Sequence, residues 1–227
     1  MCVIIFSPCK GSRPSARTLE LCEKANPHGI GIVTQGNSKM YSVSKGVSMD
    51  YLKKALANTD GAIAIHFRYA TVGGIEPELC HPFPCTHRAE NWLDYEASDV
   101  LMTNGTWMNW EQSYQIIRKL TKTPKLEGEI SDTRAMAQII GSQHSYSWLH
   151  NVTDKHPQSK RVRSLYLTKG KNKKMHFFGE WSNYEGCKFS NMRWKPQKFK
   201  ARKHPFMKYK PSATQEDFSS WLGYHYK

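Results

Sequence analysis

The sequence predicts an α+β fold, in which strands gather in antiparallel hairpins between amphipathic helices. Short apolar runs rich in β-branched residues are typical of buried strands. Two pairs of such runs flank polar turns, at 35–38 and 169–174, and each pair predicts a hairpin. Other segments repeat apolar residues every third or fourth position, which indicates helices. This pattern favours an α+β protein over a parallel, doubly wound sheet, in which strands and helices alternate.

The first part of the chain contains three expected strands and two expected helices. Residues 3–6 are an apolar strand, and residues 29–34 and 40–44 form the first hairpin. Residues 15–25 carry small and apolar side chains at helical spacing. A second helix is expected over 48–57, because a serine at its first position can cap the helix.

The remainder of the chain contains two further strands, two helices and a second hairpin. The two strands are expected at 62–70 and 100–103. The helices are expected at 107–120 and from Ser131, as the cap, through Ile140. The second hairpin pairs 161–168 with 175–179.

Charge divides the chain into two parts. The 227 residues suit one sizeable domain, or a domain with an appendage. Residues 1–154 hold 15 Lys/Arg and 15 Asp/Glu, whereas 155–210 hold 17 Lys/Arg and two Glu, a net charge of +15. Beyond Cys187 the chain is basic and aromatic, and its periodicity is weak. We therefore expect a domain over 1–187 and an extension over 188–227.

The chain carries no expected membrane segment or secretion signal. No apolar run approaches the roughly 20 residues that a membrane helix needs. The opening run of residues 1–6 is shorter than the apolar region of a signal peptide. These observations predict a cytoplasmic protein whose cysteines are reduced.

The segment Cys80-His81-Pro-Phe-Pro-Cys85-Thr-His87 contains residue types that bind zinc. No second ligand pair follows at zinc-finger spacing. The alternative is a rigid segment, bounded by prolines, with small buried thiols. We expect no bound metal.

Cys2 directly follows the initiator Met1, and a small residue at this position permits removal of Met1. Removal would leave a free α-amine and a thiol on one residue. The reference pKa values of these groups are about 8 and about 8.5, so the amine can act as general base for the thiol near neutral pH. The alternative is that Cys2 is an ordinary small residue at the start of a strand.

Acyl transfer from such a thiol needs donors for the developing oxyanion and groups that hold the substrate. Thr103-Asn104-Gly105 follows an apolar strand, so an amide NH₂ and a glycine N–H can point at one oxyanion; the alternative is an Asn-Gly turn. Arg68 ends another strand and can bind a carboxylate or, alternatively, hold backbone carbonyls. Asp132 can hold an ammonium group or belong to a helix cap.

Taken together, these segments resemble the class II glutamine amidotransferases of the N-terminal nucleophile hydrolase superfamily. They occur in the family's order, with roughly its spacing, over residues 2–140. The stretch 178–191 also resembles the late strand region of small stand-alone members. The matching pieces are Met1-Cys2-Val-Ile, Asn26-Pro-His28-Gly29-Ile-Gly31, His66-Phe-Arg68-Tyr-Ala-Thr71, His81-Pro-Phe83, Thr103-Asn104-Gly105 and Ser131-Asp132-Thr133.

The resemblance implies a four-layer αββα sandwich of two mainly antiparallel sheets flanked by helices. It implies that a thioester on the N-terminal cysteine releases ammonia from glutamine or a related γ-glutamyl amide, without a cofactor. The implied roles are a nucleophile and its own amine base at Cys2, an oxyanion hole at Asn104 and Gly105, a carboxylate site at Arg68 with Thr71, and an ammonium site at Asp132.

Two positions depart from the family. His28 stands where the family commonly has Asp before a glycine, and Thr103 stands where it often has His before the Asn-Gly pair. Substrate preference therefore stays open. The chain also lacks a recognisable synthase domain, so ammonia would pass to a separate acceptor enzyme or be released.

A second hypothesis is a catalytically silent member of this fold. It would bind nucleic acid or an acidic partner through residues 155–210, where aromatic residues are interleaved among the cations. The alternative is a solvated basic face whose aromatics pack on the domain. A peptidase of the same superfamily is a third option, but the pair Arg68 and Asp132 suits the zwitterion of a free amino acid better.

Overall fold

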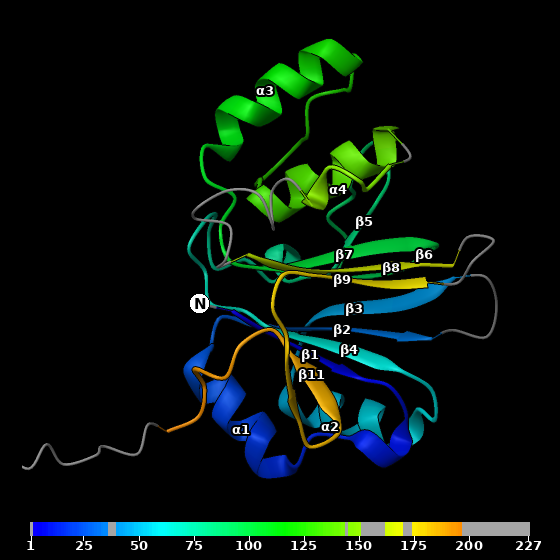
Figure 1. Ribbon diagram of the computed structural model, residues 1–227, viewed down its shortest axis with the longest axis vertical. Helices are drawn as coiled ribbons and strands as arrows, with labels where there is room; N and C mark the ends of the chain where they lie inside the picture. Colours follow the sequence, from blue (N-terminus) through cyan, green and yellow to red (C-terminus); the bar gives the residue numbers. More distant parts are fainter. Residues whose placement is uncertain (1, 36–39, 144, 151–161, 170–173, 197–227) are drawn as a thin grey trace, which may run out of the picture. The chain divides into compact units, whose positions relative to one another are not determined.

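The computed structural model describes residues 2–35, 40–143, 145–150, 162–169 and 174–196 (Figure 1). Their strands form two antiparallel sheets, which lie face to face between two pairs of helices (Figure 1). Helices α1 and α2 cover one sheet, and α3 and α4 cover the other. The α+β prediction and its four-layer arrangement are confirmed.

The first sheet has seven strands in the order β10-β11-β1-β4-β2-β3-β6. β1 is an interior strand of this sheet, because Val3 pairs with Phe67 of β4 while Ile5 pairs with Phe189 of β11. The strands are β1 (Val3–Ser7), β2 (Ile30–Gln35), β3 (Tyr41–Val47), β4 (Ile63–Phe67), β6 (Asp94–Ala97), β10 (Ser182–Tyr184) and β11 (Cys187–Phe189).

The second sheet has the order β5-β7-β8-β9. Its strands are β5 (Phe83–Pro84), β7 (Asp99–Asn104), β8 (Arg163–Thr168) and β9 (Lys174–Phe178). Both expected hairpins are confirmed, since β2 pairs antiparallel with β3 and β8 with β9. Residues 36–39 and 170–173, which include most of the turns expected at 35–38 and 169–174, lie outside the described residues.

All four expected helices form, with small differences in their bounds. Ser15 and Ser48 cap α1 (Ala16–Ala25) and α2 (Met49–Asn58), because each hydroxyl accepts a backbone N–H of the first turn. α4 (Asp132–Gln143) begins directly after Ser131, whose hydroxyl accepts the Arg134 N–H at 3.2 Å. α3 (Trp110–Thr121) begins three residues later than expected. Two 3-10 turns, η1 (Lys10–Ser12) and η2 (Pro77–Leu79), complete the elements.

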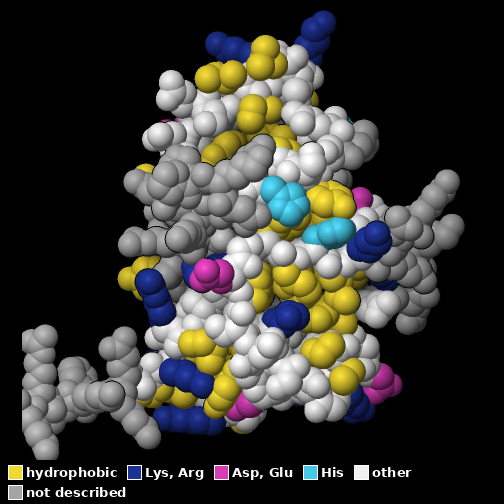
Figure 2. All heavy atoms as spheres, in the orientation of Figure 1, with side chains coloured by type: hydrophobic (Ala, Val, Ile, Leu, Met, Phe, Trp, Pro, Cys, Tyr) yellow, Lys and Arg dark blue, Asp and Glu magenta, His cyan; other side chains and the backbone are white. Residues whose placement is uncertain are grey.

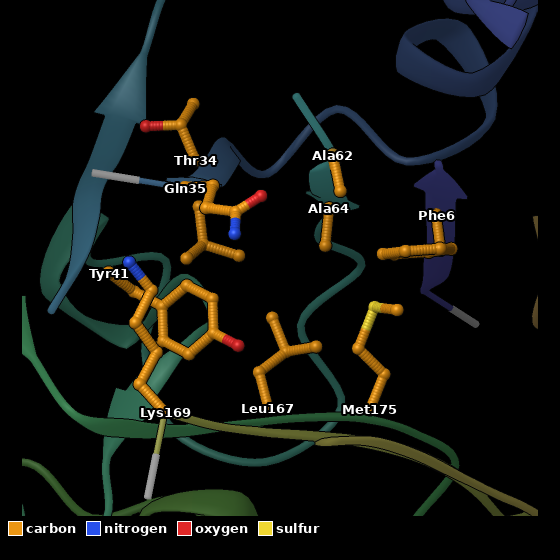
Figure 3. Close-up of a pocket in the computed structure, with 10 residues that line it drawn as sticks. Phe6, Thr34, Gln35, Tyr41, Ala62, Ala64, Leu167, Lys169 and Met175 are labelled. Atoms are coloured by element: carbon orange, nitrogen blue, oxygen red, sulfur yellow. The ribbon is translucent and has the colours of Figure 1, made fainter. Parts of the chain in front are cut away.

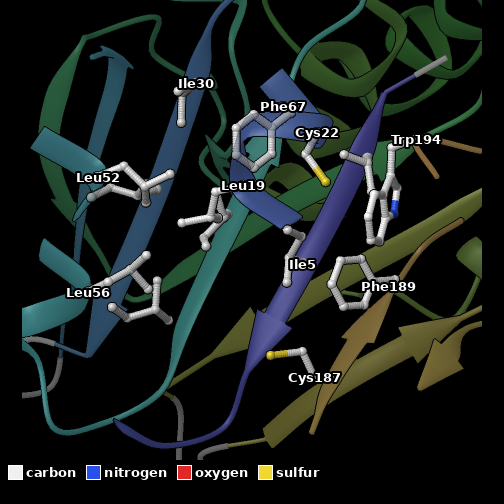
Figure 4. Close-up of a cluster of buried hydrophobic side chains, with 14 residues drawn as sticks. Ile5, Leu19, Cys22, Ile30, Leu52, Leu56, Phe67, Cys187, Phe189 and Trp194 are labelled. Carbon is white, nitrogen blue, oxygen red and sulfur yellow. The ribbon is translucent and has the colours of Figure 1, made fainter. Parts of the chain in front are cut away.

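Three apolar clusters join the layers. One lies between α1, α2 and the first sheet and includes Ile5, Phe67 and Trp194 (Figure 4). The second packs α3 and α4 on the second sheet, and the third fills the space between the sheets. α3 is the outermost helix of Figure 1; its surface carries hydrophobic side chains among Lys and Arg (Figure 2), with Leu120 79% exposed.

The expected boundary at 187–188 falls inside β11. Phe189 and Trp194 are buried against α1 and the first sheet, and the compact unit of the chain extends to Lys195. Residues 197–227 of the expected extension lie outside the described residues. No helix in the described ranges is long and apolar enough to cross a membrane.

Gly29 and Gly31 bring β2 close to the segment that follows η2. A Cβ atom on Gly31 would lie 1.8 Å from the carbonyl oxygen of His81, and one on Gly29 would lie 2.6 Å from the sulfur of Cys80. Gly29 also has a φ of +124°, which other residues rarely adopt. These glycines explain the Gly-Ile-Gly pattern as one of close packing between two backbone segments.

Candidate active site

Cys2 directly precedes β1 and is half-buried. Its sulfur accepts the Tyr69 N–H at 3.3 Å and donates to the Tyr69 carbonyl at 3.4 Å. Its own carbonyl accepts the side-chain NH₂ of Asn191 at 2.7 Å. Burial raises the pKa of the thiol, although the Tyr69 N–H and Arg68 oppose that shift. A thiol in this setting needs a base to become a nucleophile.

Arg68 follows β4 directly and is 3% exposed. β4 is shorter than the expected strand, so residues 68–74 form a loop beside Cys2. One guanidinium nitrogen, Nη2, donates to the Val72 carbonyl at 3.3 Å. The other, Nη1, is buried and has no hydrogen-bond partner within the described part of the chain. Arg68 therefore keeps one donor free, and a buried cation with a free donor favours an anionic ligand.

Asp132 opens α4 and is 6% exposed. Oδ2 accepts the Trp107 N–H at 2.8 Å, and Oδ1 accepts the Thr133 N–H at 2.8 Å. Burial raises the pKa of the carboxyl group, and these backbone donors work against the rise. The start of α4 also favours the negative charge, because a helix N-terminus carries a partial positive charge.

Cys2, Arg68 and Asp132 line one small pocket, together with Thr71 and Gly105. The ion pairs of the described residues are Lys10–Asp60 and Arg17–Glu20, so Arg68 and Asp132 pair neither with each other nor with another described side chain. Gly105 has a φ of +118°, which suits glycine. The pocket thus contains one thiol, one cation and one anion.

Asn104 is the predicted site residue whose side chain lies apart from this pocket lining. It ends β7 and is fully buried. Its NH₂ group donates to the Ser190 hydroxyl at 2.9 Å, and its Oδ1 has no hydrogen-bond partner among the described residues. In this orientation the amide faces the segment after β11.

Two buried histidines pack against the pocket. The rings of His66 and His81 stack with centroids 4.0 Å apart, and His81 lines the pocket. Burial lowers the pKa of His66 to about 3 and that of His81 well below its usual value. The ring nitrogen Nδ1 of His81 accepts the Thr103 N–H at 3.3 Å, which ties the strand end before Asn104 to the Cys80–His81 segment.

The sequence did not single out Tyr69 or Asn191 as site residues. Tyr69 holds the sulfur of Cys2 through its backbone, and Asn191 holds the carbonyl of Cys2 through its side chain. The likeness of residues 178–191 to the late strand region of the resembled family is the one signal that pointed to Asn191. Contacts made by the backbone, such as those of Tyr69, do not depend on residue type and so cannot be predicted from a pattern of side chains.

The arrangement of residues 80–87 does not support the interpretation of this segment as a zinc site. Cys80 is buried against Gly29, and His81 stacks on His66. Within the ranges that the structure describes, no three Cys, His, Asp or Glu side chains gather as a metal site would require.

A second cavity, of about 90 Å³, lies between the sheets (Figure 3). Its wall is mostly apolar and includes Phe6, Ala64 and Leu167. Lys169 is its cation; the ammonium donates to the Met40 carbonyl and lies 4.8 Å from the centre of the Tyr41 ring. The lining contains no thiol and no carboxylate.

Several solved structures are similar to this chain, among them two enzymes. One is a glutamine phosphoribosylpyrophosphate amidotransferase from B. subtilis complexed with ADP and GMP, with 18% identity and a TM-score of 0.44 over 74% of this chain and 35% of that chain. The other is described as the allosteric regulatory enzyme of purine biosynthesis, with 21% identity and a TM-score of 0.42 over 74% of this chain and 36% of that chain. This chain spans about a third of the length of each. No protein-family model and no curated protein matches it.

Proposed function

We propose that this protein is a cysteine amidohydrolase of the glutamine amidotransferase type. It hydrolyses the side-chain amide of glutamine, or of a related γ-glutamyl compound, and releases ammonia. The observation that carries the proposal is the pocket in which Arg68 and Asp132 lie near Cys2, neither of them in an ion pair with another described residue. A free amino acid supplies the missing partners, because its carboxylate matches Arg68 and its ammonium matches Asp132.

The reaction proceeds through a thioester on Cys2. After removal of Met1, the α-amine takes the thiol proton and the sulfur attacks the amide carbon of the substrate. The tetrahedral intermediate expels ammonia, which leaves with the proton returned by the amine. Water then hydrolyses the thioester and frees glutamate. The raised pKa of the buried thiol supports the need for this base.

The Gly105 N–H and the side chain of Asn104 are the proposed oxyanion donors. Rotation of the Asn104 amide by 180° exchanges its two ends. Oδ1 then accepts from the Ser190 hydroxyl, and the NH₂ group takes the place of the unpartnered oxygen. Asn104→Ala is expected to lower kcat by about 10²–10³-fold, the usual cost of losing one oxyanion donor.

Ammonia release from glutamine, asparagine and γ-glutamyl amides tests the proposal on protein whose intact mass shows that Met1 is absent. Cys2→Ala should abolish turnover, whereas Cys9→Ala, which removes an exposed thiol, should leave it unchanged. Undiminished turnover in Cys2→Ala, or full activity in protein that retains Met1, would refute the mechanism.

The alternative of a nucleic-acid or acidic-partner binder rests on residues 155–210, and 155–161, 170–173 and 197–210 lie outside the described residues. A separate ammonia-accepting enzyme stays part of the proposal for the amidohydrolase. Cytoplasmic location is likewise an expectation from the sequence.

A further inference from the structure

His28 holds the peptide that contacts the sulfur of Cys2. The β2–β4 ladder ends where Ile30 pairs with Phe67. Two backbone bonds continue it by one step: Arg68 donates its N–H to the Gly29 carbonyl at 2.8 Å, and His28 donates its N–H to the Arg68 carbonyl at 3.0 Å. Beyond Arg68 the backbone turns away from β2, because the N–H and carbonyl of Tyr69 are both directed at Cys2.

Beyond the end of the backbone ladder, the imidazole of His28 makes the next contacts with the Tyr69–Ala70 segment. Its Nδ1 accepts the Ala70 N–H at 2.9 Å, a contact in which this nitrogen carries no proton. The same ring stacks on Tyr69, with centroids 5.0 Å apart and planes inclined by 26°. His28 therefore fixes the chain before Tyr69, after Tyr69 and at the Tyr69 ring itself.

The backbone of His28 is itself fixed. Gly29 follows with a φ of +124°, and no Cβ fits at Gly29 because the Cys80 sulfur would lie 2.6 Å away. The position of His28 relative to the Arg68–Ala70 segment is thus set by the close packing of Gly29 on Cys80 and by the two backbone hydrogen bonds to Arg68. Small errors in the placement of a nucleophile can lower a rate by about 10²-fold.

We propose that His28 is a positioning residue, which sets the Tyr69 peptide against the Cys2 sulfur through its acceptor Nδ1. The proposal rests on the role of Cys2 as nucleophile. It gives a function to His28, a position at which this sequence departs from the resembled family.

Two variants separate the acceptor from the ring. His28→Asn loses the ring but keeps an acceptor, because Oδ1 is bonded to Cγ as Nδ1 is. His28→Phe keeps a ring that can stack on Tyr69 but has no acceptor. His87→Phe, at an exposed histidine outside the pocket lining, is the matched control.

The first measurement is glutamine turnover. His28→Phe should lower kcat by about 10–100-fold and leave KM within about threefold. The reason is that the substitution displaces the Cys2 sulfur but not the groups that bind the charges of the substrate. His28→Asn should retain kcat within about threefold of the natural protein, and His87→Phe should match it. Equal kcat in His28→Phe and the natural protein would overturn the proposal.

The second measurement needs no turnover. The rate of Cys2 alkylation by iodoacetamide is followed against pH by peptide mass spectrometry. The Tyr69 N–H, the N-terminal amine and Arg68 favour the thiolate, whereas burial and Asp132 disfavour it. The variants are chosen to alter only the contact of the Tyr69 N–H. The midpoint should move to higher pH in His28→Phe and stay in place in His28→Asn; an unmoved midpoint in His28→Phe contradicts the proposal.

The two measurements distinguish a failed positioning role from a failed enzymatic function. If the midpoint shifts in His28→Phe but the natural protein does not turn over glutamine, the positioning role of His28 is supported and the proposed substrate is wrong. If His28→Phe does not fold, His28→Gln replaces it, because its acceptor lies one bond farther from the backbone and should give the same loss.

Discussion

The Cys2 pocket and the Lys169 cavity both contain a buried cation, but the two cations are used differently. Lys169 donates to the Met40 carbonyl and lies over the Tyr41 ring. Arg68 donates to Val72 with Nη2 and leaves Nη1 without a partner in the described part of the protein. Burial of a polar donor without a partner costs about 1–3 kcal/mol. The Cys2 pocket therefore has a buried donor that a ligand can satisfy, whereas the cation of the cavity is already bound by protein groups.

The largest expected effect is a loss of catalytic efficiency on substitution of Arg68 that substitution of Lys169 does not cause. Arg68→Gln should lower kcat/KM for glutamine by about 10²–10³-fold, mainly through KM, because a buried contact to the substrate carboxylate is lost. Lys169→Met should leave kcat/KM within about twofold. Steady-state kinetics on both variants checks this, and equal losses in the two would break the comparison.

Acid sensitivity is the next largest effect and belongs to the pocket. Burial lowers the pKa of His66 to about 3 and lowers that of His81 well below its usual value. The unfolded chain binds protons on these histidines near pH 6.5 and the folded chain does not, so stability is complete above that pH and is lost as the pH falls from about 6.5 towards 3.

The expected slope is roughly 1.4 kcal/mol per pH unit for each such histidine. Urea unfolding at several pH values measures it. His66→Asn, which keeps an acceptor for the His81 N–H, should flatten the slope by about one site. An unchanged slope would show that His66 takes up its proton in the folded protein too.

The smallest effect belongs to the cavity. Ala64 faces the space of about 90 Å³ between the sheets, and Ala64→Val fills part of it. We expect a gain of about 1 kcal/mol, and hence a rise in Tm of roughly 2–4 °C, without a change in turnover. A loss of activity in this variant would mean that the cavity serves the reaction, and the contrast between the two regions would fail.

Local patterns predicted the elements that local interactions stabilise. Ser48 and Ser131 cap helices as expected, and the two hairpins pair as their turn residues indicated. The strands β10 and β11 have three residues each. β11 pairs with β1, which is far away in sequence, and β10 pairs with β11. Short runs of this kind carry no periodicity, so the residue pattern predicted neither strand, and the expected extension began at residue 188, inside β11.

The site was predictable to the same degree. Cys2, Arg68, Thr71, Gly105 and Asp132 were named from the sequence, and they line one pocket. The orientation of the Asn104 amide depends on Ser190, 86 residues away, and the hold on the Cys2 carbonyl depends on Asn191, 189 residues away. Contacts over such separations are set by the packing of the sheet and are not visible in any local pattern.

Affinity labelling tests the central claim most directly, that the Cys2 thiol attacks a substrate held by its two charges. A glutamine analogue with a chloroketone in place of the amide alkylates a thiol that lies where the amide carbon would be. The account predicts one adduct, on Cys2, which glutamine prevents and Arg68→Gln slows by at least about tenfold. Labelling of the exposed Cys9 instead, or equal labelling of Cys2 in Arg68→Gln, would contradict it.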